Sequence, residues 1–453
     1  MNRGAEGDFL RHPKGLAFIV FTEAWERFSF YGMQALLVLY MAGYLLHPGA
    51  IENIVAFAGF RSALETVFGP LSIQALATQI FGLYIGLIYM MPVFGGWLGD
   101  RVMGQQKAVL LGAAMMAIGH FLMAFEAAFL FALSALVVGA GLLKGNLAAQ
   151  VGRLYAKNDQ RRDSAFSLYC MSINVGAFLA PLVCGTLGEL YGWHYGFGAA
   201  GIGMLVGIVI YLSGRKYLPA DSEKIEKGEK PTLQEGDGRT IASIFALFLI
   251  AALFWTAQTQ VWNTYPLWIR DRVDRAFFDT SVPITWFQAL DSLAVLLLAP
   301  FVLWLWRVQS NRKAEPGDLT KIIIGCAVFA GACVWLALGE IVSGGQPLGL
   351  IWPTIFHFIC AIGFLYVGPI MLALVSRTAP DAVNAMLVGS YYLSLFIGGM
   401  VSGWLGRFYE QVSEPTFWLI HAAIVGAGAV LVALFRRPFT RNLKLEVAPS
   451  EPC

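Results

Sequence analysis

The feature that most constrains this chain is a series of about twelve apolar segments, each long enough to form a helix across a bilayer, which takes ~20 residues. Charged residues make up only 13% of the 453 residues, against about 25% in soluble domains. We therefore expect an all-α polytopic membrane protein rather than a soluble enzyme. The expected spans are 15–45, 74–98, 107–129, 131–153, 163–188, 193–214, 240–266, 284–306, 319–342, 349–377, 382–406 and 415–435.

A strongly polar stretch, DSEKIEKGEKPTLQEGDGR, separates the sixth expected span from the seventh. Its composition is that of a solvated linker. We therefore expect an N-terminal six-helix bundle at 1–217, a cytoplasmic linker at 218–239, and a C-terminal six-helix bundle with a short cytoplasmic tail at 240–453. Two bundles of six helices form the architecture of the major facilitator superfamily.

The distribution of Lys and Arg over the loops predicts the orientation, because cytoplasmic loops are rich in these residues. With both termini in the cytoplasm, most of the 31 cationic residues flank the cytoplasmic ends of the spans. Arg27 and Lys144 fall inside spans. The opposite side holds only Arg61, Arg270, Arg272, Arg275 and Arg407.

Four charged residues lie inside spans of the N-terminal half, where each costs at least ~2.5–3.5 kcal/mol. Glu23, Glu26 and Arg27 are spaced so that all three project from one face of the first helix. Lys144, in the fourth span, is the natural second cation. In such a coupled cluster, protonation of a carboxylate frees a cation to bind another anion. The alternative is that the charges only hold two helices together, which Ser, Thr or Asn would do at lower cost.

The stretch Glu23-Ala-Trp-Glu26-Arg27-Phe28-Ser29-Phe30-Tyr31-Gly32 has the pattern ExxERFxxYG. It resembles the first-helix signature of the proton-dependent oligopeptide transporter (POT/PTR) family. Three further stretches fit this resemblance, which is more specific in the N-terminal half. GGWLGDRVMGQQK (95–107) resembles a loop motif of major facilitators, LLKGN (142–146) the family's fourth-helix Lys segment, and FSLYCMSINVGAFLAPLVCG (166–185) its fifth-helix signature.

The resemblance implies proton-coupled symport of short peptides, di- and tripeptides, by alternating access. The proton gradient would supply the energy, with no cofactor. Glu23, Glu26, Arg27 and Lys144 would couple the proton, and the two cations would also receive the peptide carboxylate. The expected partners are short peptides or peptide-like small molecules, protons and the lipid bilayer. The expected location is a bacterial inner membrane, and the expected functional unit is a monomer.

The resemblance also implies a substrate cavity with an aromatic wall, which tolerates varied side chains. Any single aromatic residue in a chain that is 14% aromatic has packing or a lipid-facing position as its alternative role. Gln34 replaces an Arg that usually follows the first-helix signature. The substrate-binding residues implied are Tyr31, Gln34, Tyr84, Lys144, Asn174, Trp255, Thr259, Asp291 and Tyr391.

The C-terminal half departs from the family pattern at its usual carboxylates. Thr259 occupies the acid position of the seventh-helix pattern, and Phe364 occupies the usual Glu position of the tenth. Asp291 is instead the acid well inside a span of this half. We expect it to anchor a substrate ammonium or to bind a proton. The alternative is a structural polar residue paired with Gln258, Gln260 or Gln288.

Two charged loops are candidates for gates. In GGWLGDRVMGQQK the glycines allow close backbone approach, and Asp100 and Arg101 are placed to pair with neighbouring helix ends. In the family this loop braces a gate. On the opposite side, Arg61 and Asp271 or Asp274 would close an outer gate by an ion pair between the halves. The alternative is a solvated charge run, in which such a pair contributes little.

Other functions are alternatives to peptide symport. The lost carboxylates normally face a peptide's amino group, so the substrate could be a peptide-like metabolite, a peptidomimetic or an anion. A non-transporting sensor could use the same fold. The sequence has no nucleophile motif, phosphate loop or metal-ligand spacing, so we expect no catalytic residues and no metal. The 31 basic and 29 acidic residues offer no basic face for nucleic acid.

Overall fold

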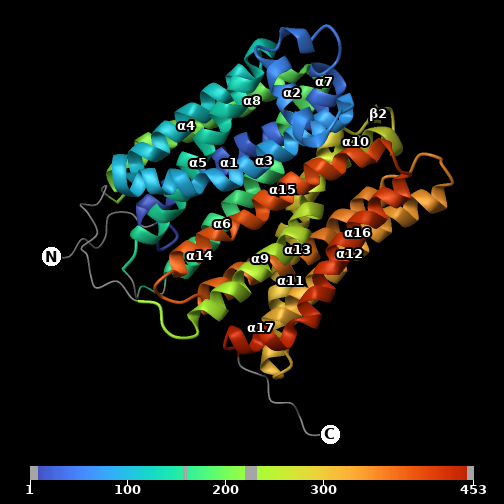
Figure 1. Cartoon of the computed structure of the whole chain (residues 1–453). Helices are drawn as coiled ribbons and strands as arrows, with labels where there is room; N and C mark the ends of the chain where they lie inside the picture. Colours follow the sequence, from blue (N-terminus) through green and yellow to red (C-terminus); the bar gives the residue numbers. More distant parts are fainter. Residues whose placement is uncertain (1–8, 157–158, 160, 220–231, 446–453) are drawn as a thin grey trace. The chain divides into compact units, whose positions relative to one another are not determined.

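The structure, a computed structural model, describes residues 9–156, 159, 161–219 and 232–445 (Figure 1). It confirms the predicted all-α class. Within these residues the strands are limited to β1 (Ala276–Phe277) and β2 (Thr280–Ser281), which pair with each other. Of the predicted linker at 218–239, residues 220–231 lie outside the described residues.

In the described part of the chain, eleven helices are long and apolar enough to cross a membrane, and each overlaps one predicted span. The remaining predicted span, 107–129, corresponds to α4 (Gln105–Leu122). This 18-residue helix is less apolar because it contains two Gln residues, Lys107 and His120. It packs along α5 and α8 (Figure 1). The chain is an integral membrane protein.

The helices pack into two units, and two helices, α3 and α11, contribute residues to both. The first unit takes its described residues from Met1–Ala77, Leu87–Ile225 and Phe277–Ser292. Its elements are α1 (Lys14–Tyr40), η1 (Met41–Leu45), η2 (Ile51–Asn53), α2 (Phe57–Phe68), both ends of α3 (Ile73–Leu98), η3 (Gly99–Met103), α4, η4 (Glu126–Ala128), α5 (Phe129–Arg153), α6 (Arg161–Ala180), η5 (Pro181–Gly185), α7 (Thr186–Tyr191), α8 (Trp193–Gly214), η6 (Arg215–Tyr217) and the start of α11 (Ile284–Asn311).

Helix α1 is the central helix of the first unit. It packs against α5, α6 and α8. Most of its residues are buried, Ile19, Met33 and Leu36 completely, whereas Phe21 is about half exposed. A largely buried helix has little solvent face on which to place charged residues. The charged residues of α1 other than Lys14 are accordingly buried in the interior of the unit.

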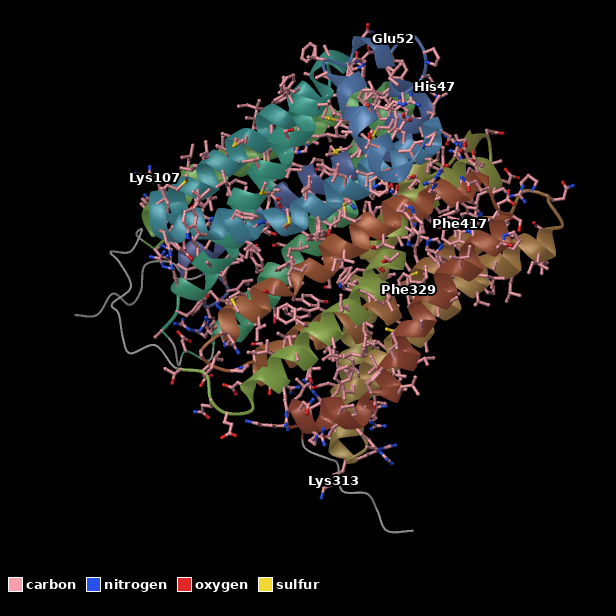
Figure 2. The ribbon with its side chains drawn as sticks, in the orientation of Figure 1. His47, Glu52, Lys107, Lys313, Phe329 and Phe417 are labelled. Carbon is pink, nitrogen blue, oxygen red and sulfur yellow. The ribbon has the colours of Figure 1, made fainter. Side chains whose placement is uncertain are left out.

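The second unit takes its described residues from Thr78–Gly86, Glu226–Ala276 and Leu293–Cys453. Helix α9 packs against α15 and α16, and α12 packs against α13 and α16. Figure 2 labels Phe329 of α12 and Phe417 of α16, both buried in this unit. Besides parts of α3 and α11, its elements are α9 (Asp237–Gln260), α10 (Thr264–Arg272), α12 (Asp318–Ser343), α13 (Ile351–Thr378), α14 (Asn384–Ser390), α15 (Tyr392–Gly406), η7 (Arg407–Glu410), α16 (Glu414–Leu434) and α17 (Arg436–Asn442).

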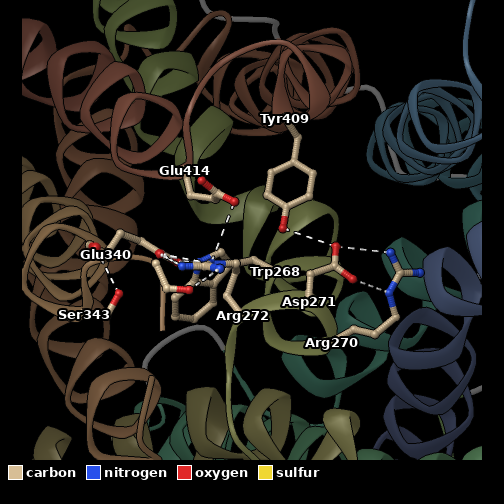
Figure 3. Close-up of polar contacts among 9 residues, drawn as sticks. Trp268, Arg270, Asp271, Arg272, Glu340, Ser343, Tyr409 and Glu414 are labelled. Carbon is tan, nitrogen blue, oxygen red and sulfur yellow. Dashed lines mark hydrogen bonds and ion pairs between the residues drawn. The ribbon is translucent and has the colours of Figure 1, made fainter. Parts of the chain in front are cut away.

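Arg272, the last residue of α10, forms a polar cluster within the second unit (Figure 3). Its Nε and Nη2 donate to Glu340 Oε2 of α12 at 3.0 and 2.8 Å. Trp268 Nε1 donates to Glu340 Oε1 at 2.5 Å, and Arg272 Nε lies 3.7 Å from Glu414 Oε1. Only 4% of Glu340 is exposed. The cluster therefore ties α10 to α12, and it was not predicted from the sequence.

We expect Glu340→Ala to lower the melting temperature of the protein. The substitution leaves the guanidinium of Arg272 and the indole N–H of Trp268 without their shared acceptor. Removing one partner of a buried pair costs about 3–5 kcal/mol, and the partial exposure of Arg272 favours the lower value. Intrinsic tryptophan fluorescence during heating of purified variants in one detergent measures the shift.

Glu414→Ala is the matched control, because the Glu414 side chain is 38% exposed and contacts the same guanidinium at a longer distance. We expect it to change the melting temperature little. Equal melting temperatures for the two variants would show that the buried pair does not stabilise the unit.

Candidate functional site

Helix α1 brings Glu23, Glu26 and Arg27 together inside the first unit, as their spacing predicts. Arg27 Nε lies 2.9 Å from Glu23 Oε1 and 2.5 Å from Glu26 Oε2. All three side chains are buried, Glu26 completely. Glu26 Oε1 has no hydrogen-bond partner among the described residues. One guanidinium thus serves two carboxylates in a surrounding where unpaired charge is costly.

Lys144 of α5 is the second cation at this place. It interacts electrostatically with Arg27, Glu26 and Glu23. Its Nζ lies 4.3 Å from the centre of the Phe30 ring and 4.7 Å from that of Tyr89. Contact with two ring faces stabilises an ammonium that has been removed from water. We call Glu23, Glu26, Arg27 and Lys144 the charge cluster.

Tyrosine side chains and one further acid surround the charge cluster. Tyr31, one turn after Arg27, interacts electrostatically with Arg27, with Glu26 and with Asp291 at the start of α11. Tyr169 of α6 is buried and interacts with Glu23 and Arg27. Asp291, which is far away in the sequence, therefore acts electrostatically on the same tyrosine as the charge cluster.

Gln34 and Asn174 are the other predicted substrate residues of the first unit. Gln34 is buried, and its Oε1 has no hydrogen-bond partner among the described residues. Asn174 is half-buried on α6, and its Nδ2 donates to the Cys170 carbonyl oxygen at 3.0 Å. Gln34 therefore offers an unused acceptor, whereas the Asn174 amide group is oriented by its own helix.

The second unit holds the remaining predicted substrate residues. Trp255 Nε1 donates to the Tyr391 hydroxyl at 3.2 Å, and the Phe364 ring packs edge-on against Trp255 with 6.2 Å between centroids. Thr259 Oγ1 donates to the Trp255 carbonyl oxygen at 2.7 Å. Tyr84, on the part of α3 that belongs to this unit, is buried. Where the family usually has carboxylates, this unit therefore presents an aromatic ring and a hydroxyl bonded to its own helix.

The loop motif of residues 95–107 begins in direct contact with α5. A Cβ at Gly95 would lie 2.1 Å from the Gly141 carbonyl oxygen, and one at Gly99 would lie 2.0 Å from Asn146 Oδ1. Asn146 Nδ2 donates to the Gly95 carbonyl oxygen at 2.9 Å. The predicted close backbone approach is therefore present at Gly95. At Gly99 the close neighbour is the Asn146 side chain, and at Gly96 a Cβ would meet no atom of the described residues within 4 Å, so the prediction fails there.

Asp100 and Arg101 lie in η3, at the end of this contact. Asp100 Oδ1 accepts a hydrogen bond from Gln105 Nε2 at 2.8 Å. Gln105 Oε1 in turn accepts from Arg153 Nη1, at the end of α5, at 2.9 Å. Arg101 is exposed. The link from Asp100 to a neighbouring helix end thus runs through Gln105. The gating role of both residues stays a prediction.

Arg61 and Asp271, the predicted outer gate, each have a partner within their own unit. Arg61 Nε donates to Glu65 Oε1 at 2.9 Å. The hydrogen bonds from Arg61 and from the Leu71 amide hold the pKa of Glu65 below its usual value. Asp271 Oδ1 accepts from Arg270 Nε at 2.7 Å (Figure 3). An ion pair between Arg61 and Asp271 stays a prediction.

We expect Gly95→Val to reduce the yield and melting temperature of the folded protein, because its side chain would overlap the α5 backbone. Overpacking of this kind costs about 1–3 kcal/mol or more. Gly96→Val is the matched control, since a Cβ at Gly96 meets no atom within 4 Å. Size-exclusion chromatography and thermal unfolding measure both effects. Equal yields and melting temperatures would contradict the close packing at Gly95.

The chain is similar to known peptide transporters over nearly its whole length. The POT family profile matches residues 106–227 and 224–420 of the chain. A peptide transporter of Yersinia enterocolitica is 30% identical over 94% of each chain. A di-/tripeptide transporter of Lactococcus lactis subsp. cremoris is 24% identical over 96% of this chain and 97% of its own. A crystal structure of a peptide transporter POT in complex with sulfate is 28% identical, with a TM-score of 0.84, over 96% of this chain and 97% of that chain. The predicted resemblance is therefore confirmed, and this chain belongs to the POT family.

Proposed function

We propose that this protein is a proton-coupled symporter of short peptides that works by alternating access. The observation that carries the proposal is the buried charge cluster in a member of the POT family. Relatives named as peptide transporters align with nearly the whole chain. The proton gradient supplies the energy, and no cofactor takes part.

The charge balance of the cluster couples the proton to an anionic substrate. With Glu23 and Glu26 both ionised, their charges balance those of Arg27 and Lys144. A proton on either carboxylate leaves one positive charge in excess, which favours binding of a peptide carboxylate. Because linkage is reciprocal, the bound carboxylate favours the same proton. Proton and peptide therefore enter the site together more readily than either enters alone.

The two ends of the peptide have separate partners in this proposal. The carboxylate binds Lys144 and Arg27, with a polar contact from Asn174. The ammonium binds Asp291, beside Tyr31. The aromatic and polar residues Tyr31, Gln34, Tyr84, Trp255, Thr259 and Tyr391 contact the rest of the substrate.

The remaining parts of the proposal concern location and organisation. We place the protein in a bacterial inner membrane with both termini in the cytoplasm. The functional unit is one chain. The six-helix bundles comprise 1–217 and 240–453, joined by the linker at 218–239. Asp100 with Arg101 and Arg61 with Asp271 serve as gates on the two sides of the membrane.

Transport of a peptide-like metabolite, a peptidomimetic or an anion is the second candidate function. It is favoured by Phe364, which packs on Trp255 where the family usually has a Glu. One similar structure, 28% identical with a TM-score of 0.83, is a mutant peptide transporter POT in complex with alafosfalin. A sensor that binds a ligand without accumulating it is the third. Competition assays with dialanine, trialanine, alafosfalin and nitrate separate these candidates.

We expect an inward proton gradient to drive uptake of labelled dialanine into proteoliposomes. Glu26→Gln removes a protonation site in the charge cluster and is expected to reduce gradient-driven uptake about tenfold or more. Exchange of labelled for unlabelled dialanine without a gradient is expected to persist. Glu52→Gln, which alters an exposed acid outside the spans, is the control and should transport normally. Undiminished gradient-driven uptake by Glu26→Gln would exclude the proton role of Glu26.

We expect Asp291→Asn to raise the KM for dialanine about tenfold, the effect of losing ~1.4 kcal/mol of binding. The ammonium of the peptide loses its acidic partner in this variant. An N-acetylated dialanine, which has no ammonium, should show no such difference between wild type and variant. Ser292→Ala is the neighbouring control. Unchanged KM and full proton-driven uptake by Asp291→Asn would exclude a role for Asp291.

A further inference from the structure

We propose that Glu189 is a positioning residue for transport, which holds the first turn of α11 and thereby keeps Asp291 beside Tyr31. The inference rests on the proposed function, in which Asp291 binds the substrate ammonium. Glu189 itself touches no substrate. It acts through the position of α11.

The Glu189 carboxylate, on α7, binds the first residues of α11 with both oxygens. Glu189 Oε2 accepts from the Ile284 amide at 2.8 Å. Glu189 Oε1 accepts from the Thr285 amide and from Thr285 Oγ1, both at 2.8 Å. The first amides of a helix have no acceptor within the helix, and they carry the positive end of its dipole. One carboxylate thus satisfies two otherwise unpaired amides and a hydroxyl.

Two further contacts join the same two segments. We call the contacts of Gly185, Thr186 and Glu189 with the first turn of α11 the docking point. Trp286 Nε1 donates to Thr186 Oγ1 at 2.8 Å. A Cβ at Gly185 would lie 2.0 Å from Thr285 Oγ1, so only a glycine at this position permits the approach. The segment from Gly185 to Glu189 therefore holds the first turn of α11. Two backbone amides and two side chains of α11 donate the hydrogen bonds, and Glu189 and Thr186 accept them.

Packing against other helices contributes less to holding α11 in place than it does for the other membrane spans. Of the spans in the described chain it is the least buried: 22% of its most apolar stretch is buried, against 39% or more in the others. Gln288 is fully buried, but its side-chain nitrogen and oxygen have no hydrogen-bond partner among the described residues. Polar anchoring of the helix start thus comes from Glu189 and from the pair Trp286–Thr186 rather than from Gln288.

The docking point lies on the helix that carries Asp291. Ile284, Gln288 and Asp291 are spaced i, i+4 and i+7, so they lie on one face. Seven residues of helix separate Ile284 from Asp291 by about 10 Å. A shift or rotation of the first turn is therefore transmitted to Asp291, and a displacement of about 1 Å is enough to impair a charged contact.

Transport kinetics in proteoliposomes test the positioning role. We expect Glu189→Ala to raise the KM for dialanine about fivefold, as expected for a lost hydrogen-bonded contact, with a smaller effect on the maximal rate. The KM for N-acetylated dialanine should not change. Glu189→Gln retains one acceptor oxygen and is expected to be intermediate. The double variant with Asp291→Asn should be no worse than Asp291→Asn alone.

Glu52→Gln is the matched control. Glu52 Oε2 also accepts from a backbone amide, that of Gly49 at 2.7 Å, but Glu52 is exposed and lies in the short helix η2 (Figure 2). Its substitution should leave the KM unchanged. An unchanged KM for Glu189→Ala, or effects of Glu189→Ala and Asp291→Asn that add fully in the double variant, would overturn the proposal.

Cross-linking tests the docking point without any transport, so it separates a failure of this inference from a failure of the proposed function. Thr186→Cys and Trp286→Cys are combined in a background in which Cys170 and Cys453 are replaced by Ser. We expect rapid disulfide formation with oxidant, slowed about fivefold when Glu189→Ala is added. Equal rates with and without Glu189 would overturn the proposal. Slowed cross-linking in a protein that does not transport dialanine would support the docking point and reject the proposed function.

Discussion

The proposed coupling of proton and peptide depends on the ion pairs of Arg27 with Glu23 and Glu26. Helix α1 is largely buried in its unit, and Glu23, Glu26 and Arg27 are all among its buried residues. Such charges are costly within a membrane unless they are paired. Lys144, held against two aromatic rings, balances the second carboxylate. A neutral cluster of four ionisable groups can then take up a proton and a substrate carboxylate together without a change in total charge.

The chemistry of the C-terminal half is arranged differently from the usual family pattern. Phe364 and Thr259 have no carboxylate. Phe364 packs on Trp255, and the Thr259 hydroxyl donates to its own helix. Asp291 is instead the acid of this half that interacts electrostatically with Tyr31, as the charge cluster does. Substrate binding by Asp291 requires a fixed position of α11, which is the least buried of the described spans. In our proposal the hydrogen bonds from the first turn of α11 to Glu189 fix this position within the first unit.

The predictable part of the fold and site is the part that depends on local periodicity. Spacing along one helix places Glu23, Glu26 and Arg27 together, and the glycines of the 95–107 motif indicate close packing that the structure shows at Gly95 and Gly99. Contacts between distant segments were mostly not predictable; Lys144 is the exception, because a cation inside a span needs an anionic partner. The pair Arg272–Glu340 and the contact of Glu189 with α11 join residues 68 and 95 positions apart, and no local pattern specifies such partners. The sequence shows only that Arg272, Glu340 and Glu189 are charged residues near the ends of spans, which does not identify their partners.

The central claim is that peptide and proton cross the membrane together. Proteoliposomes loaded with a pH-sensitive dye test it most directly, with the membrane potential clamped and no initial pH difference. If the protein is a symporter, an inward dialanine gradient acidifies the lumen of liposomes that contain the wild-type protein. The Glu26→Gln variant should give no acidification. Entry of labelled dialanine into wild-type liposomes without acidification would contradict the central claim.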